Sequence, residues 1–303
     1  MSAAVSREER YGDVLFASDR SREDDRLSGL AETFDPASRS VLLSLGLDST
    51  WECLDVGAGT GTLSSWLAGM ATGPGRVCAV DRDVRFLRRL PAKGLEIVEA
   101  DITDPAFDPG RFDLVHARFV LMHLRRRDEL LPRLASWVKP GGSLVLSDSL
   151  AVGGETSPHA PYRQTVRSLW RMLANTIGTD RHYAARYPQA LTDIGLVEIG
   201  TDMHLPVVGL DAGFSRFLDL TLRQSRDNLL AGGLRPEVFD AALEHLGRPL
   251  ARELFFAMVT AWGRKPVTPA RDHRESGCSP NSVPTVPMSP KARRSGPSAF
   301  PDP

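Results

Sequence analysis

The feature that most constrains this chain is a set of closely spaced glycines directly after an apolar segment. Residues 51–56 are mostly apolar, and Gly57, Gly59 and Gly61 then stand at every second position. Apolar side chains recur at helical spacing from Leu63 onward. This order predicts a strand, a tight turn and a helix, because glycine allows the backbone conformations that such a turn needs. The turn would present backbone amides at a helix N-terminus, where the helix dipole favours negative or polar ligand groups.

The glycine spacing separates two classes of ligand site. A dinucleotide-binding turn reads G-x-G-x-x-G. In this chain the third glycine, Gly61, comes one residue early, and Thr62 occupies the position that the fingerprint requires. The spacing therefore argues against a dinucleotide site.

Short apolar runs alternate with segments of helical spacing through the first half of the chain. We expect strands at residues 51–56, 76–80, 95–98, 112–115 and 143–147. We expect the intervening helices at residues 63–70, 83–90 and 128–138, with Asp128 as a cap and residues 139–142 as a stop. Such alternation favours a parallel sheet with right-handed crossovers and helices on both faces. Ligands in sheets of this kind bind beyond the carboxyl ends of the strands.

The second half of the chain reads differently. Residues 151–195 are rich in aromatic residues and histidine and indicate a loop followed by a helix. Strands are expected at residues 196–208 and 254–262, and residues 210–246 have helical spacing with a break at Gly232. A helical insertion between two late strands would cover the carboxyl edge of the sheet as a lid.

Composition excludes several classes of protein. The formal net charge of −1 gives no electrostatic footprint for nucleic acid. The three cysteines do not form a C-x-x-C pair, and Cys53 and Cys78 are expected as buried strand residues. Neither a signal peptide nor a membrane span is indicated, so we expect a cytoplasmic protein. No cluster of side chains suggests a metal site.

Several segments together resemble the class I S-adenosylmethionine (SAM)-dependent methyltransferases. Residues 54–62 are similar to the first motif of that superfamily, and acidic or polar residues follow the later strands at the matching places. The matching segments are residues 80–83, 100–102, 112–118 and 134–146. The later aromatic-rich portion and residues 261–266 look like an actinobacterial small-molecule branch of the family.

The resemblance implies a Rossmann-like α/β fold with a seven-stranded, mostly parallel sheet, helices on both faces and a helical lid. Residues 1–50 would form an N-terminal helical arm and residues 51–150 the SAM-binding core. Residues 151–263 would supply the acceptor-side lid and the final strands of the same domain. Residues 264–303 are rich in proline, serine and arginine, and we expect a disordered tail there.

Three acidic residues are candidates for cofactor binding. Asp81 ends its strand about 20 residues after the glycine turn, where a carboxylate can accept both ribose hydroxyls; the alternative is a helix N-cap. Asp101 would accept from the adenine amine, with Ile102 against the ring, or would simply cap a loop. Asp55 would order the glycine turn near the methionine amine, or serve structure alone.

The remaining cofactor candidates lie in the glycine turn and after the second and fourth strands. Arg118 would pair with the methionine carboxylate or be a solvent-exposed arginine. The glycines either approach the cofactor or pack the helix against the sheet, and the Thr60 hydroxyl either contacts the cofactor or begins the helix. The full set assigned to cofactor binding also contains Gly57, Ala58, Gly59, Gly61, Arg82 and His116.

Methyl transfer is an in-line displacement at carbon, so the protein must mainly align the reactants and exclude water. His123 is the candidate for a catalytic base, with a packed histidine beside the cofactor as the alternative. The resemblance implies that Tyr11 and Phe16 of the arm close the site, with a frayed helix as the alternative. Four lid residues are candidates for a base or for acceptor positioning, with ordinary surface as the alternative: His159, Tyr162, His182 and Tyr183.

The acceptor is expected to be a small organic molecule, a secondary metabolite methylated at oxygen or nitrogen. Residues 116–119 lack the Asn/Asp-Pro-Pro-Tyr/Phe sequence of enzymes that methylate nucleobase amino groups, so that class is disfavoured. Two alternatives stay open: a non-catalytic SAM-binding regulatory protein and a protein or RNA methyltransferase. No nucleic-acid or membrane partner is expected.

Overall fold

A seven-stranded sheet runs through the part of the chain that the computed structural model describes, residues 10–17, 22–91 and 94–267. The strand order across the sheet is β3-β2-β1-β4-β5-β7-β6. The strands are β1 (Glu52–Val56), β2 (Arg76–Asp81), β3 (Leu95–Glu99), β4 (Phe112–Arg118), β5 (Val138–Ala151), β6 (Val197–His204) and β7 (Phe256–Arg264).

The sheet is parallel except at one strand. Strands β1 to β5 pair with one another in parallel, whereas β7 is antiparallel to both β5 and β6. The predicted seven-stranded, mostly parallel sheet is therefore confirmed. The strand order reverses between β1 and β4, and ligand crevices open beside such a switch point in α/β sheets.

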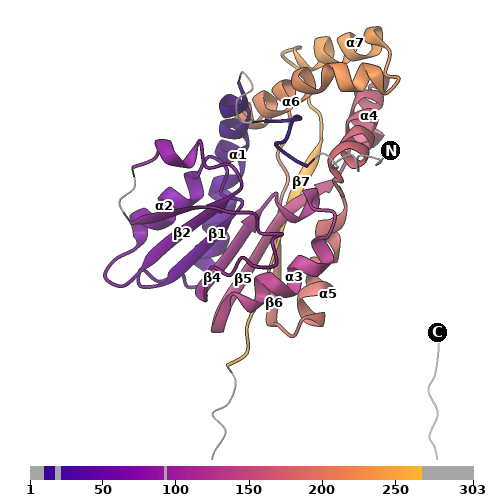
Figure 1. The fold of residues 1–303 in the computed structure, drawn as a ribbon. Coiled ribbons are helices and arrows are strands. Elements are labelled where there is room, and N and C mark those ends of the chain that lie inside the picture. Colours follow the sequence, from indigo (N-terminus) through magenta and orange to yellow (C-terminus); the bar gives the residue numbers. More distant parts are fainter. Residues whose placement is uncertain (1–9, 18–21, 92–93, 268–303) are drawn as a thin grey trace, which may run out of the picture. The chain divides into compact units, whose positions relative to one another are not determined.

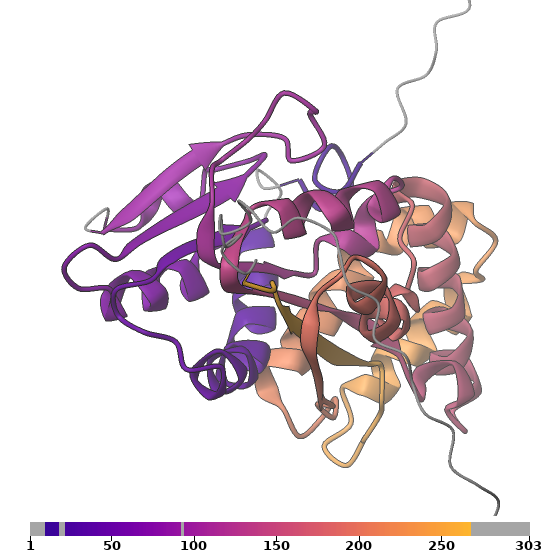
Figure 2. The same ribbon diagram turned by 90° about the horizontal axis from the view of Figure 1, so that it is seen from below.

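Alternation along each strand explains why helices cover both faces (Figure 2). In β1, Leu54 and Val56 pack into a core with α3 (Arg127–Ser136) and α5 (Tyr187–Asp193). Cys53 points to the other face of the sheet and packs into the opposite core with α2 (Thr62–Met70). A strand buried on both faces needs apolar residues at both odd and even positions. This is why these strands are continuous apolar runs in the sequence. Cys53 and Cys78 are both buried, as predicted.

Three further helices gather beyond one end of the sheet (Figure 1). They are α4 (Ala160–Ile177), α6 (Ala212–Ala231) and α7 (Pro236–Leu246). The His159 and Asp211 side chains cap α4 and α6 by accepting backbone N–H groups. The chain leaves α6 at Gly232, where the sequence predicted a break. These helices share a third apolar core with β7, so the predicted helical lid is present.

Helix α1 (Glu23–Ser44) crosses α6 at very short range. A Cβ added to Gly29 would lie 2.6 Å from the Gly213 carbonyl oxygen, and one on Gly213 would lie 2.8 Å from the Gly29 oxygen. The Thr33 hydroxyl donates to the Gly29 carbonyl at 2.8 Å, and Asp211 lies 3.0 Å from the same hydroxyl. The crossing fixes the first turns of α1 against the lid.

The predicted helix over residues 83–90 is wrong. Only a 3-10 turn, Leu87–Arg89, forms there. The Asp81 carboxylate accepts the Asp83 N–H at 3.0 Å, and the Asp83 carboxylate accepts the Arg85 N–H at 3.1 Å. These local side-chain bonds compete with the helical bonds that the segment would need. Other 3-10 turns span Leu121–His123, Gly154–Thr156 and Tyr183–Arg186.

Two predicted boundaries also shift. Helix α3 begins at Arg127 rather than after Asp128, and it ends at Ser136. Residues 139–142 belong to β5, because an irregular register between Phe112 and Leu114 lets this strand start at Val138.

The predicted tail begins too early in the sequence. Arg264 still lies in β7, and Lys265 exchanges backbone hydrogen bonds with the glycine pair before Ser143. Its ammonium group also donates to the carbonyls of Ala135 and Val138. Residues 264–267 therefore belong to the described fold, and the rest of the predicted tail lies outside the described residues. Within the described part of the chain, no helix combines the length and apolarity needed to cross a bilayer.

Candidate active site

A cavity of about 700 Å³ lies where the carboxyl ends of β1, β2 and β4 face the lid. The sheet contributes the glycine turn and the acidic strand ends, and the arm contributes Tyr11 and Phe16. Aromatic side chains of the lid and of β7 close the other end. The cavity therefore has a polar half on the sheet and an aromatic half under the lid.

The glycine turn has the conformation that its sequence predicts. Gly57, Gly59 and Gly61 have φ values of 66°, 56° and 73°, a region that other residues rarely adopt. A Cβ on Gly57 would lie 2.3 Å from a Val120 methyl group, whereas one on Gly59 would meet no atom within 4 Å. Gly59 therefore opens onto the cavity, together with Ala58 and Thr60.

Gly61 has a different task from Gly59. It is the N-cap of α2, without a side-chain cap, and is not among the residues that line the cavity. A Cβ on Gly61 would lie 2.5 Å from side-chain atoms of both Leu87 and Leu90. This glycine lets the start of α2 pack closely against the 3-10 turn at Leu87–Arg89, whereas the alternative stated for it was packing against the sheet.

Asp81 connects the second strand to the glycine turn. One carboxylate oxygen accepts the Gly59 N–H at 2.9 Å, and the other accepts the Asp83 N–H at 3.0 Å. Burial raises the pKa of this carboxyl group, against the lowering effect of those two hydrogen bonds. No helix begins at Arg82, so Asp81 is not a helix cap.

Asp55 forms a buried polar pair with His116 on the neighbouring strand. The two residues are register partners, and an Asp55 oxygen lies 2.9 Å from the imidazole Nδ1. The other oxygen accepts the Ser64 hydroxyl of α2 at 2.5 Å. His116 Nε2 is buried without a hydrogen-bond partner among the described residues, although His116 lines the cavity.

Asp101 lies at the rim, where the arm crosses the strand ends. Its carboxylate accepts the Thr103 N–H at 2.9 Å and the Arg10 guanidinium at 2.5 Å. Burial alone would raise the pKa of Asp101, but the hydrogen bonds from Thr103 and Arg10 lower it to about 2. Ile102 is buried beside it and also lines the cavity.

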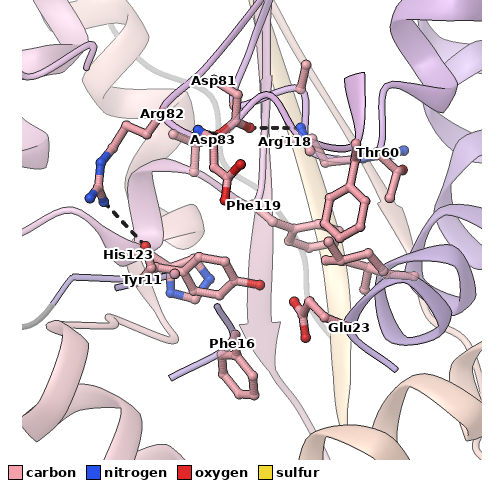
Figure 3. Close-up of a pocket in the computed structure, with 18 of the residues that line it drawn as sticks. Tyr11, Phe16, Glu23, Thr60, Asp81, Arg82, Asp83, Arg118, Phe119 and His123 are labelled. Carbon is pink, nitrogen blue, oxygen red and sulfur yellow. Dashed lines mark hydrogen bonds between the residues drawn. The ribbon is translucent and has the colours of Figure 1, made fainter. Parts of the chain in front are cut away.

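The two arginines of the predicted set both have internal partners. Arg82 forms an ion pair with Asp13 of the arm at 2.6 Å and donates to the Tyr11 carbonyl (Figure 3). Arg118 donates to Asp35 at 2.7 Å and to the Ser38 hydroxyl at 3.0 Å, both on α1. The Arg118 guanidinium is thus held by α1 and is not a solvent-exposed arginine, and it also lines the cavity.

His123 lies at the junction between the two halves of the cavity. Its ring packs against that of Tyr11 in a tilted arrangement with centroids 4.6 Å apart, and its Nδ1 lies 2.9 Å from the Thr179 hydroxyl (Figure 3). Burial lowers its pKa to about 3, and the charges of Arg26 and Arg127 act in the same direction. The imidazole is therefore neutral near pH 7.

The four predicted acceptor contacts of the lid are not among the residues that line the cavity. His159 caps α4 and stacks on His245 at 3.7 Å, and the Tyr162 hydroxyl donates to the Leu254 carbonyl. His182 is exposed, and the Tyr183 hydroxyl donates to Asp128. His159 and Tyr162 serve the packing of the lid, Tyr183 is tied to α3, and none of the four lines the cavity, so the structure does not place them at an acceptor.

The aromatic half is built mostly from residues that the sequence did not single out. Glu23 and Arg26 of α1 form a buried ion pair at 2.6 Å and line the cavity. Their i, i+3 spacing on a helix was the one local signal for this pair. The aromatic lining consists of Phe16, predicted from the arm, with Phe119, Trp170, Phe217, Phe255 and Phe256.

Known proteins are similar to parts of this chain. The family described as a methyltransferase domain matches residues 54–146. Methyltransferase str3 of Strobilurus tenacellus is 33% identical over 128 residues, which cover 42% of this chain and 44% of that protein. Phosphoethanolamine N-methyltransferase 3 of Arabidopsis thaliana is 27% identical over 35% of this chain and 19% of its own length. The chain thus spans less than half the length of these two curated relatives.

Solved structures agree at the level of the fold. Phosphoethanolamine N-methyltransferase 2 of Haemonchus contortus, in complex with phosphomonomethylethanolamine and S-adenosylhomocysteine, aligns with a TM-score of 0.53 and 16% identity. The alignment covers 82% of this chain and 59% of that one. Residues 54–146 are therefore similar to the methyltransferase domain family, and the chain shares its fold with that solved methyltransferase.

Proposed function

We propose that this chain transfers a methyl group from SAM to an oxygen or nitrogen atom of a small organic molecule of secondary metabolism. One observation carries the proposal: a single cavity joins the glycine turn and Asp81 to an aromatic chamber. A methyltransferase needs both halves, because the methyl donor and the acceptor must meet in line. The match to the methyltransferase domain family supports the same activity.

The polar half fits the chemistry of SAM. Each carboxylate oxygen of Asp81 accepts one backbone N–H, which leaves lone pairs for two ribose hydroxyls. The open space at Gly59 lets a ligand approach the backbone, and the unpartnered Nε2 of His116 is available to a polar ligand group. Ile102 offers an apolar surface for adenine, with Asp101 beside it as an acceptor for the amine.

When bound, SAM supplies a methyl group on a sulfonium, which is already an activated leaving group. The task left to the protein is to align the acceptor and keep water out. Residues 10–17 serve this task from the arm, since Tyr11 and Phe16 line the cavity and ion pairs at Arg10 and Asp13 tie the arm to the strand ends.

The environment of His123 suits a role in aligning the reactants better than a role as a base that abstracts a proton. Its neutral ring has the right charge to accept a proton, but a pKa of about 3 makes it a weak base near neutral pH. The ring contact with Tyr11 instead holds the arm over the junction of the two halves. We therefore propose His123 as a positioning residue.

Calorimetric titration with SAM and S-adenosylhomocysteine tests the proposal. The wild-type protein should bind both, and Asp81→Ala should weaken binding at least tenfold, about 1.4 kcal/mol. Asp108→Ala is the matched control, because its carboxylate lies on an exposed loop and bonds only to its own turn. Equal affinities for wild type and Asp81→Ala would contradict the ribose assignment. No binding to the wild type would contradict the proposed activity.

A further inference from the structure

The acceptor half of the cavity contains one polar cluster among aromatic side chains. It consists of Tyr11, Glu23, Arg26 and Thr221, and we call it the α1 cluster (Figure 3 shows Tyr11 and Glu23). The side chains of Glu23 and Arg26 are only 1% and 3% exposed. Buried charges of this kind are costly unless they are paired, so their presence in a binding cavity calls for an explanation.

The Arg26 guanidinium is held on several sides. Its Nε and Nη2 donate to the two oxygens of Glu23 at 2.8 and 2.6 Å, and Nη2 also donates to the Tyr11 hydroxyl. Nη1 lies 3.5 Å from the Thr221 hydroxyl, at the limit of a hydrogen bond. The Phe16 ring lies 4.1 Å from the guanidinium carbon. A guanidinium has five N–H groups, so one on Nη1 is left for a ligand in the cavity.

Tyr11 offers a second donor at the same place. Its oxygen accepts from Arg26, and its own proton has no acceptor among the described residues. Burial raises the pKa of Tyr11 despite the opposing charge of Arg26, so the hydroxyl stays protonated. The α1 cluster therefore presents hydrogen-bond donors to the aromatic chamber.

The cationic side chains around the cavity are each paired with a carboxylate. Every arginine that lines the cavity within the described residues has a carboxylate partner: Arg26 with Glu23, Arg82 with Asp13, Arg85 with Asp83, Arg88 with Glu99 and Arg118 with Asp35. Among the described residues, no lysine lines the cavity. A phosphate or carboxylate on the acceptor would find no uncompensated cation there, and its desolvation would not be repaid.

We propose that the acceptor is an uncharged, planar aromatic molecule whose hydroxyl or carbonyl oxygen is held by the α1 cluster, which disfavours phosphorylated acceptors. This inference rests on the proposed function and names its acceptor class. Arg26 and Tyr11 are the specificity-determining donors, and Glu23 is a positioning residue that also cancels the charge of Arg26. The aromatic lining supplies flat apolar contacts for the rest of the molecule.

A matched pair of probes tests the charge preference. We would titrate 2-naphthol and 2-naphthyl phosphate into the protein saturated with S-adenosylhomocysteine. The two probes share one ring system and differ in charge. The wild type should bind 2-naphthol at least tenfold more tightly than the phosphate. Equal or tighter binding of the phosphate, or no binding of 2-naphthol at millimolar concentration, would overturn the acceptor assignment.

A charge-switch variant tests the α1 cluster itself. Glu23→Gln leaves Arg26 uncompensated, so the preference should shift at least tenfold toward 2-naphthyl phosphate. Glu244→Gln is the matched control, because Glu244 of α7 forms an exposed ion pair with Arg248 just beyond that helix, and it should leave the preference unchanged. A structural role for Glu23 alone would weaken both probes equally, and that result would overturn the proposal.

A second variant keeps the test decisive if Glu23→Gln does not fold. Tyr11→Phe removes one donor and should weaken 2-naphthol about threefold to tenfold, the range of one net hydrogen bond. An unchanged 2-naphthol affinity in Tyr11→Phe would count against the α1 cluster. Titration of SAM into the same proteins separates the two proposals. If the wild type does not bind SAM, the proposed function is contradicted. If it binds SAM but prefers 2-naphthyl phosphate to 2-naphthol, only the acceptor class is overturned.

Discussion

The two halves of the cavity are built in different ways. The polar half uses backbone conformation and short loops: the glycine turn follows β1 directly, and Asp81 ends the next strand. Its central hydrogen bond joins residues only 22 positions apart. The aromatic half is assembled from the arm, α1, α4, α6 and β7, and the contact of Arg26 with Thr221 spans 195 positions.

Because the two halves are built differently, substitutions in one half should have different effects from substitutions in the other. The polar half depends on φ angles and backbone amides, so substitutions there act through backbone strain and through the space left for a ligand. The aromatic half depends on side-chain packing, so substitutions there act through cavities and lost ring contacts. If the two halves are separable, stability and cofactor affinity should respond to different residues.

The largest expected effect belongs to Phe256 in the aromatic half. This side chain is 3% exposed, and its ring contacts those of Phe34, Trp170 and Phe214 among others. Phe256→Ala should lower the free energy of unfolding by about 3–5 kcal/mol. SAM affinity, measured at a temperature where the variant is folded, should stay within about twofold, or roughly 0.4 kcal/mol.

Leu250→Ala is the control for that prediction, because Leu250 is 87% exposed. Its unfolding free energy should change by less than about 0.5 kcal/mol. A large loss of SAM affinity in folded Phe256→Ala would show that the two halves are coupled, and the comparison would fail.

The same difference decides what could be predicted from sequence. The glycine turn, the strand ends and Asp81 are local patterns, so the sheet and the polar half follow from consecutive residues. The lid helices could be predicted from their periodicity, but the side that faces the cavity could not. His159 and Tyr183 have the right chemistry for an acceptor site, yet His159 stacks on His245 and Tyr183 bonds to Asp128 of α3. Glu23 and Arg26 enter the site only because the α1–α6 crossing brings them there.

In the polar half, two neighbouring glycines should respond differently to the same substitution. Gly57→Ala adds a methyl group 2.3 Å from Val120 at a φ of 66°, so strain and overpacking together should cost about 2–5 kcal/mol of stability. Gly59→Ala meets no protein atom and should cost only about 1–2 kcal/mol, from the left-handed conformation. Its methyl group would point into the cavity, so SAM affinity should still fall at least tenfold, about 1.4 kcal/mol.

Urea unfolding and calorimetric titration of both variants check this contrast. A Gly59→Ala protein with unchanged SAM affinity would mean that the cofactor does not approach the backbone at this turn. Equal losses of stability in the two variants would mean that Val120 moves aside without cost.

The smallest expected effect is on the pH dependence of activity, and it concerns the junction at His123. Because burial lowers the pKa of His123 to about 3, the ring stays neutral from pH 6 to 8. The pH–rate profiles of wild type and His123→Asn should therefore have the same shape near pH 6.5.

The pH dependence of the unfolding free energy should respond to His123 instead. Between pH 6.5 and 3 the unfolded chain binds a proton that the folded protein does not, so this group makes the folded state less stable as the pH falls. His123→Asn should therefore flatten the acid side of the stability profile, whereas His182→Asn, at an exposed position, should not. A rate inflection near pH 6.5 that disappears in His123→Asn would instead assign His123 a proton-transfer role at the point where the two halves meet.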